Sequence, residues 1–98
     1  MNATQEKIKL VFDSVCSLVM KKNEQYGDSA ITPLKIFCKS DNYNQIEARL
    51  DDKCNRLKNL KVDDASYKDT VVDIMGYLCL LIISKGWEKD ILKGLKDN

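Results

Sequence analysis

Two carboxylates stand one helical turn apart in the most apolar stretch of this chain. The stretch DTVVDIMGYLCLLIIS, residues 69–84, opens with Asp69 and Asp73, and Tyr77 follows at the same four-residue spacing. At about 100° per residue these side chains share one strip of a helix that is apolar on its other sides. Because so apolar a helix must be covered, the strip faces either a solvent window or a pocket. Asp69 and Asp73 are candidate ligands of a hard divalent cation such as Mg²⁺.

A row of charged residues lies in the preceding helical pattern. Arginine and lysine bind phosphate oxygens, so its basic members are candidate phosphate ligands. A salt-bridged helix face explains the same spacing, because Asp52 and Arg56 form an ordinary i, i+4 pair. The segment EARLDDKCNRLKNL carries this row beside its apolar line: Arg49, Asp52, Lys53 and Arg56.

A third polar segment, KKNEQYGDS, has residue types suited to the mouth of a pocket. Gly27 permits a tight chain reversal, and Asp28 offers carboxylate oxygens. Tyr26 offers a flat face against which a base could stack. A plain helix end explains Gly27 equally well.

The apolar spacing predicts helices along the whole chain. With one proline and four glycines, the sequence is typical of an all-α fold, and its length fits a single domain over residues 1–98. We expect a small helical bundle. Its long helices should cover residues 4–25, 44–60 and 66–85, with short helices after Thr32 and after Trp87.

Local sequence signals mark the ends of these helices. Asn2 or Thr4 is expected to cap the first helix. Ser66 and Asp69 have the spacing of a capping box at the start of the third, and Gly86 is expected to end it.

The first helix should bury one face, because its apolar residues recur at steps of three and four. Helices as apolar as the first and third exceed what a bundle of 98 residues can cover alone. We therefore expect a homo-oligomer whose interface involves these two helices. The predicted buried face comprises Ile8, Val11, Phe12, Val15, Leu18 and Val19.

Composition excludes several classes of function. Sixteen basic and fifteen acidic residues leave a formal charge of +1, which argues against non-specific nucleic-acid binding. The four cysteines form no C-x-x-C pair and there is no histidine, so we expect no zinc site and reduced, buried thiols. The apolar run from Ile74 to Ile83 is about half a membrane span. Without a secretory signal pattern, the chain is expected in the cytoplasm, with no membrane partner.

Together, the three polar segments resemble one protein family. KKNEQYGDS is similar to its Asn-x-x-Tyr-Gly-Asp-Ser motif, ARLDDKCNRLKNL to its Arg-x-x-Asp-Lys-x-x-Arg block, and KDTVVDIMGYLCLLI to its Asp-Thr-x-x-Asp-x-x-x-Tyr block. The likeness covers about residues 15–85, in the family's order. The family is the first type of nucleotide-modification-associated domain, common in phages and bacteria. It resembles in turn the all-α NTP pyrophosphohydrolases of the MazG and dUTPase-like group.

The resemblance implies a MazG-like bundle that handles a nucleotide or a nucleotide-derived molecule, in the host cytoplasm if a phage encodes it. By the same likeness, Mg²⁺ held by Asp69 and Asp73 would support cleavage of a nucleoside triphosphate to monophosphate and pyrophosphate. Asp52 and Asp73 would be catalytic. The implied ligand-binding residues are Asn23, Tyr26, Asp28, Arg49, Lys53, Arg56 and Tyr77.

The chain departs from the enzyme group at its acidic motifs. Those enzymes carry Glu-x-x-Glu on one helix and Glu-x-x-Asp on another. Here Asp73 matches the last aspartate and Thr70 stands where the preceding Glu would be. Glu47 and Asp52 correspond only approximately to the other pair. Three functions remain open: a pyrophosphohydrolase, a non-catalytic nucleotide-binding protein that sequesters a host-defence signal or assists nucleotide modification, and a helical interaction module.

Overall fold

Four helices make up the fold in a computed structural model, which describes residues 1–32, 35 and 39–97, the last three through their backbone only. The described residues contain no strand, which confirms the predicted all-α class. The three long helices lie close to their expected bounds, whereas most of the short helix expected after Thr32 falls outside the described residues. The helices are α1 (Ala3–Tyr26), α2 (Asn42–Lys58), α3 (Ala65–Ser84) and α4 (Glu88–Asp97).

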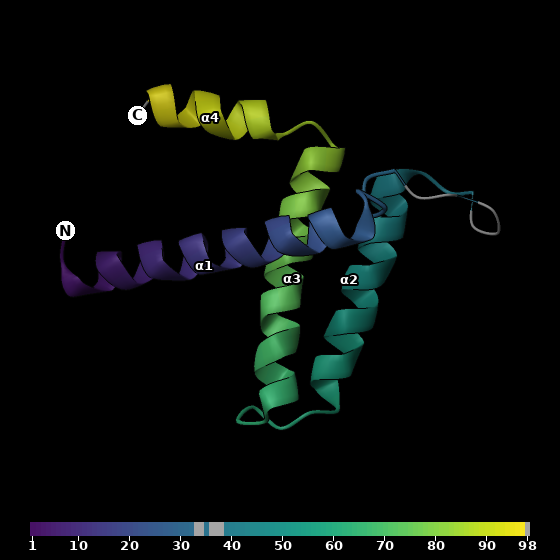
Figure 1. Ribbon diagram of the computed structural model, residues 1–98, viewed down its shortest axis with the longest axis horizontal. Helices are drawn as coiled ribbons and strands as arrows, with labels where there is room; N and C mark the ends of the chain where they lie inside the picture. The colour runs from purple at the N-terminus through teal and green to yellow at the C-terminus, as the bar shows by residue number, and fades with distance from the viewer. Residues whose placement is uncertain (33–34, 36–38, 98) are drawn as a thin grey trace.

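The helices form an open arrangement rather than a closed bundle. Figure 1 shows α2 and α3 side by side as an antiparallel pair, with α1 crossing α3 through its C-terminal half. The N-terminal half of α1 and all of α4 project to the same side of α3 (Figure 1). The radius of gyration is 15.4 Å, compared with about 12.6 Å for a compact domain of this length.

The ends of α1 follow the sequence signals. The Asn2 side chain accepts a hydrogen bond from the Gln5 N–H at 2.8 Å, and Gln5 Oε1 accepts one from the Asn2 N–H at 2.9 Å. This reciprocal cap typically stabilises a helix by about 1 kcal/mol. Gly27 ends α1 at φ 60° and ψ 40°, the left-handed conformation that glycine adopts at least cost.

The capping box predicted for Ser66 and Asp69 is wrong. α3 begins one residue earlier, after Asp64, whose side chain makes no capping hydrogen bond. Ser66 therefore lies inside the helix, where its carbonyl accepts a hydrogen bond from the Thr70 hydroxyl at 2.7 Å. At the other end, Gly86 follows α3 with φ 72°, as expected for a helix stop.

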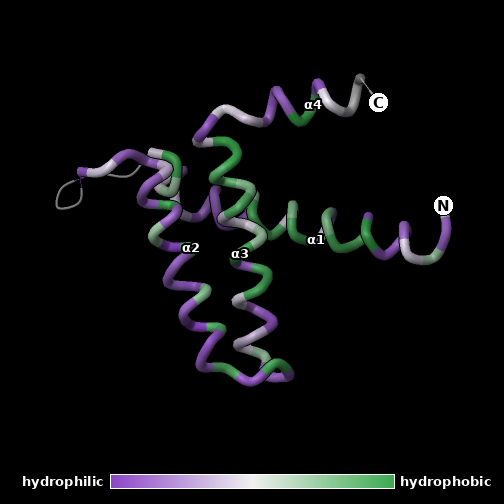
Figure 2. The backbone as a smooth tube through the Cα atoms, turned by 180° about the vertical axis from the view of Figure 1, so that it is seen from behind, coloured by the Kyte–Doolittle hydropathy of each residue, from purple (hydrophilic) through white to green (hydrophobic). Residues whose placement is uncertain are grey.

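The core of a single chain is very small. Among the described residues, Ile46 is the one buried apolar side chain, at 1% exposure. The buried face predicted for α1 is therefore wrong for the isolated chain, because no side chain within Ala3–Tyr26, a fully described helix, is buried. Figure 2 shows apolar residues along α1, including the half that projects away from α3.

The prediction of buried thiols is also wrong for the described cysteines. Cys16, Cys54 and Cys79 are free and exposed, because the helix faces that carry them are not covered in a single chain. Cys38 lies outside the described residues.

Within the described part of the chain, no single helix is long and apolar enough to span a membrane. Ala65–Ser84 and Glu88–Gly94 are long and apolar enough only when taken together, and the two helices are bent by 95° relative to each other.

Candidate functional site

A pocket of about 390 Å³ lies where α1 crosses the α2–α3 pair. Its volume falls within the range of small-molecule sites, roughly 300–1,000 Å³. All three long helices contribute to its lining, together with the turn that follows α1. The charged and aromatic lining residues are Lys22 and Tyr26 of α1, Arg49 and Lys53 of α2, and Asp73 and Tyr77 of α3.

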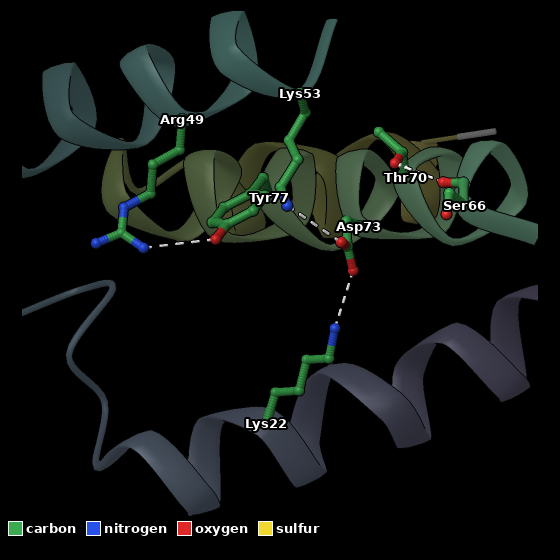
Figure 3. Close-up of polar contacts among 7 residues, drawn as sticks. All are labelled: Lys22, Arg49, Lys53, Ser66, Thr70, Asp73 and Tyr77. Atoms are coloured by element: carbon green, nitrogen blue, oxygen red, sulfur yellow. Dashed lines mark hydrogen bonds and ion pairs between the residues drawn. The ribbon is translucent and has the colours of Figure 1, made fainter. Parts of the chain in front are cut away.

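Asp73 connects the three helices through its carboxylate. Lys22 Nζ lies 2.9 Å from Asp73 Oδ1, and Lys53 Nζ lies 3.3 Å from Asp73 Oδ2 (Figure 3). The Asp73 side chain is 24% exposed, so its charge is partly removed from water. A carboxylate in that position needs charged or hydrogen-bonding partners, and the two ammonium groups supply them.

These contacts shift the ionisation of both partners. Partial burial alone would raise the pKa of Asp73, but its hydrogen bonds and charge interactions with Lys22 and Lys53 outweigh burial and lower that pKa. The hydrogen bond to Asp73 raises the pKa of Lys22, although partial burial of the ammonium group opposes this. Both groups are therefore held in their charged forms at neutral pH.

Arg49 extends from α2 toward the ring of Tyr77 on α3 (Figure 3). Its Nη1 lies 3.5 Å from the Tyr77 hydroxyl, a long contact, and most of its guanidinium N–H groups have no acceptor within the part of the chain that the structure describes. Among the described residues, Arg49 forms no ion pair. The guanidinium group thus lines the pocket with unused hydrogen-bond donors.

The pocket carries an excess of positive charge. Three cations, from Lys22, Arg49 and Lys53, line it together with a single carboxylate, from Asp73. The difference is two positive charges around one cavity. Such a site attracts an anion and opposes the binding of a free cation.

The segment that follows α1 forms a compact turn. Asn23 Nδ2 donates to Asp28 Oδ1 at 2.8 Å, and the Asp28 N–H bonds the Asn23 carbonyl at 3.3 Å. Asp28 itself has φ 65°, a left-handed conformation that aspartate tolerates better than most residues. The turn brings Ser29 and Ala30 to the pocket, whereas Asp28 is not part of the lining. Asn23 and Asp28 thus form the turn, and Asn23 also borders the cavity.

Gly76 allows the close crossing of α1 and α3. A Cβ built at this position would lie 3.1 Å from Val19 Cγ2, closer than most real Cβ contacts. Both residues line the pocket. A larger side chain at position 76 would therefore force α1 and α3 apart or displace Val19.

The structure separates several residues that the sequence placed in one site. Asp52 and Arg56 are exposed on α2 and do not line the pocket. Asp69 is exposed and borders an adjoining hollow, which shares Lys22 and Asp73 with the pocket. Of the predicted site residues, the structure brings together in the pocket Asn23, Tyr26, Arg49, Lys53, Asp73 and Tyr77.

The donor set does not fit Mg²⁺ in this arrangement. Magnesium requires several oxygen ligands in octahedral geometry, and the described residues contain no group of three or more side chains able to hold a metal ion. Both oxygens of Asp73 contact ammonium groups. Thr70 stands where the enzymes carry a glutamate. It is 2% exposed, and its hydroxyl donates a hydrogen bond to the Ser66 carbonyl rather than into the pocket.

Sequence reasoning missed Lys22 as a site residue. It is the second lysine of KKNEQYGDS, and it stands four residues before Tyr26 and three after Val19. That spacing places it on the side of α1 that meets α3, a signal that helical periodicity could have given.

Comparison with protein-family models, with curated proteins and with solved structures found no match for this chain. The likeness to the nucleotide-modification-associated domain and to the MazG-like enzymes therefore rests on the three sequence motifs and stays a prediction.

Proposed function

We propose that the pocket between α1, α2 and α3 binds a nucleotide or a nucleotide-derived phosphorylated molecule without metal-dependent hydrolysis. The observation that carries this proposal is the composition of the lining, in which three cations and two tyrosines surround a single carboxylate. Cations suit phosphate oxygens, and aromatic rings suit a base.

The phosphate would bind at Arg49 and Lys53. A guanidinium group offers planar, bidentate donors to phosphate oxygens, and those of Arg49 have little other use in this pocket. Lys22 and Lys53 add positive charge at fixed positions, because Asp73 holds both ammonium groups. Asp73 would therefore act as a positioning residue that keeps two cations ordered before the ligand arrives.

The base would lie against the tyrosines. Tyr26 is 67% exposed although it lines the pocket, so its side chain is accessible to a planar ligand. Tyr77 forms part of the opposite wall, on α3. Aromatic stacking of a base typically contributes about 1–3 kcal/mol to binding.

Binding is better supported than catalysis. The charge excess favours an anion, whereas Mg²⁺ would have to displace Lys22 and Lys53 from Asp73. Hydrolysis and the catalytic roles of Asp52 and Asp73 rest on the family resemblance alone. Mg²⁺ rests on that resemblance and on the spacing of Asp69 and Asp73. All of these remain predictions. Sequestering a nucleotide signal and assisting nucleotide modification are two roles that a binding protein of this kind could perform.

A thermal-shift screen of nucleotides, with and without Mg²⁺, tests the proposal. A ligand at one hundred times its dissociation constant should stabilise the folded protein by about 2.7 kcal/mol. We expect this shift to persist in EDTA, and chromatography of the incubated nucleotide to show no product. A shift that requires Mg²⁺ together with release of pyrophosphate would instead favour the hydrolase, and no shift with any nucleotide would contradict both functions.

A further inference from the structure

The N-terminal part of α1, residues 3–15, leaves an apolar face uncovered; we name these residues the α1 arm. Ile8, Val11 and Phe12 are 51%, 48% and 63% exposed, and Val15 is only partly covered. These four residues form the arm face. The arm projects beyond the α2–α3 pair (Figures 1 and 2). A contiguous apolar surface of this kind marks an interaction site.

The chain exposes more surface than a compact monomer of its mass, and the excess matches the area that each subunit of a stable dimer buries. The chain exposes 7841 Å², whereas a compact monomer of 11.2 kDa exposes about 5,700 Å². The difference is about 2,100 Å² per chain. Obligate homodimers bury roughly 2,000–5,000 Å² in total, or about 1,000–2,500 Å² per subunit.

The exposed apolar face needs a partner at all times, not only during a transient interaction. Because Ile46 is the one buried apolar side chain among the described residues, an isolated chain has almost no core to hold its helices together. A partner that binds only on occasion would leave the chain in that state for the remaining time. A second copy is present wherever the chain is made, and its association would complete the core.

The spacing within the arm face suits pairing with itself. Ile8, Val11, Phe12 and Val15 are separated by three, one and three positions, so the pattern reads the same in both directions. When two such helices pack antiparallel about a two-fold axis, the residue at position 8 of one faces position 15 of the other. Likewise position 11 faces position 12, so that apolar residues meet at every point of the face.

We propose that a second copy of this chain covers the arm face, with the two α1 arms packed antiparallel about a two-fold axis. Phe12 then lies near Val11 of the partner subunit. α4 projects to the same side of α3 as the arm (Figure 1), and its Ile91 and Leu92 are also exposed. This interface does not depend on whether the pocket binds a nucleotide.

Light scattering coupled to size exclusion tests the interface on the full chain. Wild type at micromolar concentration should have twice the 11.2 kDa mass of one chain. Phe12→Glu places a charge in the middle of the arm face and should abolish the dimer. Ser17→Glu is the matched control: it adds the same charge at an exposed position on the opposite side of α1, and should leave the mass unchanged.

Thermal unfolding of wild type at several protein concentrations keeps the test decisive if Phe12→Glu fails to fold. The melting temperature should rise with protein concentration, because unfolding and dissociation of an obligate dimer are linked. A wild-type monomer with a concentration-independent melting temperature would overturn the proposal. So would an assembly that Phe12→Glu leaves intact, whereas a larger assembly that Phe12→Glu dissociates and Ser17→Glu does not would support it.

Discussion

Lys22 and Asp73 stand 51 positions apart in the sequence, yet Lys22 Nζ lies 2.9 Å from Asp73 Oδ1. The contact joins the crossing helix α1 to α3, and Lys53 adds a second ammonium group from α2 at 3.3 Å. One carboxylate thus links all three long helices at the pocket. Its behaviour can be tested separately from the binding of any ligand.

Asp73→Asn should destabilise the fold by about 1–2 kcal/mol. The change removes the charge that pairs with Lys22 and Lys53, and hydrogen bonds to charged groups contribute roughly 1.5–3 kcal/mol when well shielded. The estimate is reduced because Lys22 is 46% exposed and solvent screens its part of the interaction. Urea unfolding measures the loss.

Asp69→Asn is the control for that change, because Asp69 is exposed on the same helix and forms no ion pair among the described residues. It should alter stability by no more than about 0.5 kcal/mol. Equal effects of the two substitutions would show that the lysine contacts of Asp73 add nothing to stability.

The pH dependence of stability should contain a contribution from Asp73. Because its pKa is lowered in the folded protein, its stabilising effect is present above the unfolded pKa of about 4 and is lost as the pH falls through the folded value. Asp73→Asn should therefore reduce the stability difference between pH 6 and pH 3. The raised pKa of Lys22 gives the opposite limb, with stability lost as the pH rises through its folded value. Identical acid limbs for wild type and variant would contradict this assignment.

Gly76→Ala should cost about 1 kcal/mol despite the higher helix propensity of alanine. The new Cβ would lie 3.1 Å from Val19 Cγ2, and overpacking of this kind typically costs about 1–3 kcal/mol, against a propensity gain of up to about 1 kcal/mol. Gly94→Ala in α4 is the matched control, because nothing lies within 4 Å of its added Cβ. That control should be neutral or stabilising, and Val19→Ala should relieve the cost at position 76. A Gly76→Ala variant more stable than wild type would mean that α1 moves away from α3 at little cost.

Asp28 distinguishes a turn residue from a ligand-binding residue. Asp28→Asn keeps both the tolerance for a left-handed backbone and an oxygen that accepts from Asn23, so stability should stay within about 0.5 kcal/mol of wild type. Asp28→Val should cost about 1–2 kcal/mol, because a β-branched residue is strained at φ 65°. Nucleotide affinity of the Asn variant should not change. A loss of nucleotide affinity in that variant, without a loss of stability, would show that Asp28 contributes to binding.

The sequence predicted the helices well because their signals are local. Asn2 with Gln5 and the glycine at position 27 each act within a few residues, and the structure has both features as expected. The error at Ser66 is also local. The helix begins after Asp64, and the spacing of a capping box, two polar residues three positions apart, recurs by chance in a polar segment.

The site was predictable only in part because it depends on how the helices cross. The spacing of Arg49, Lys53 and Asp73 predicted which side of each helix carries them, and these sides do meet at the pocket. It did not show that Lys22 from α1 would occupy the carboxylate that was expected to hold Mg²⁺. Nor could periodicity tell that the apolar face around Phe12 lies uncovered in one chain, since the same pattern serves a core and an interface.

Calorimetric titration of a nucleoside triphosphate in EDTA, on matched arginine variants, tests the binding site most directly. Arg49 lines the pocket, whereas Arg56 is exposed on the same helix and does not. Arg49→Ala should weaken binding at least tenfold, or about 1.4 kcal/mol, because it removes bidentate phosphate donors. Arg56→Ala should bind as wild type does, and both variants should unfold within about 0.5 kcal/mol of it. Binding that is absent in EDTA, or that both variants weaken equally, would contradict a metal-independent phosphate site at Arg49.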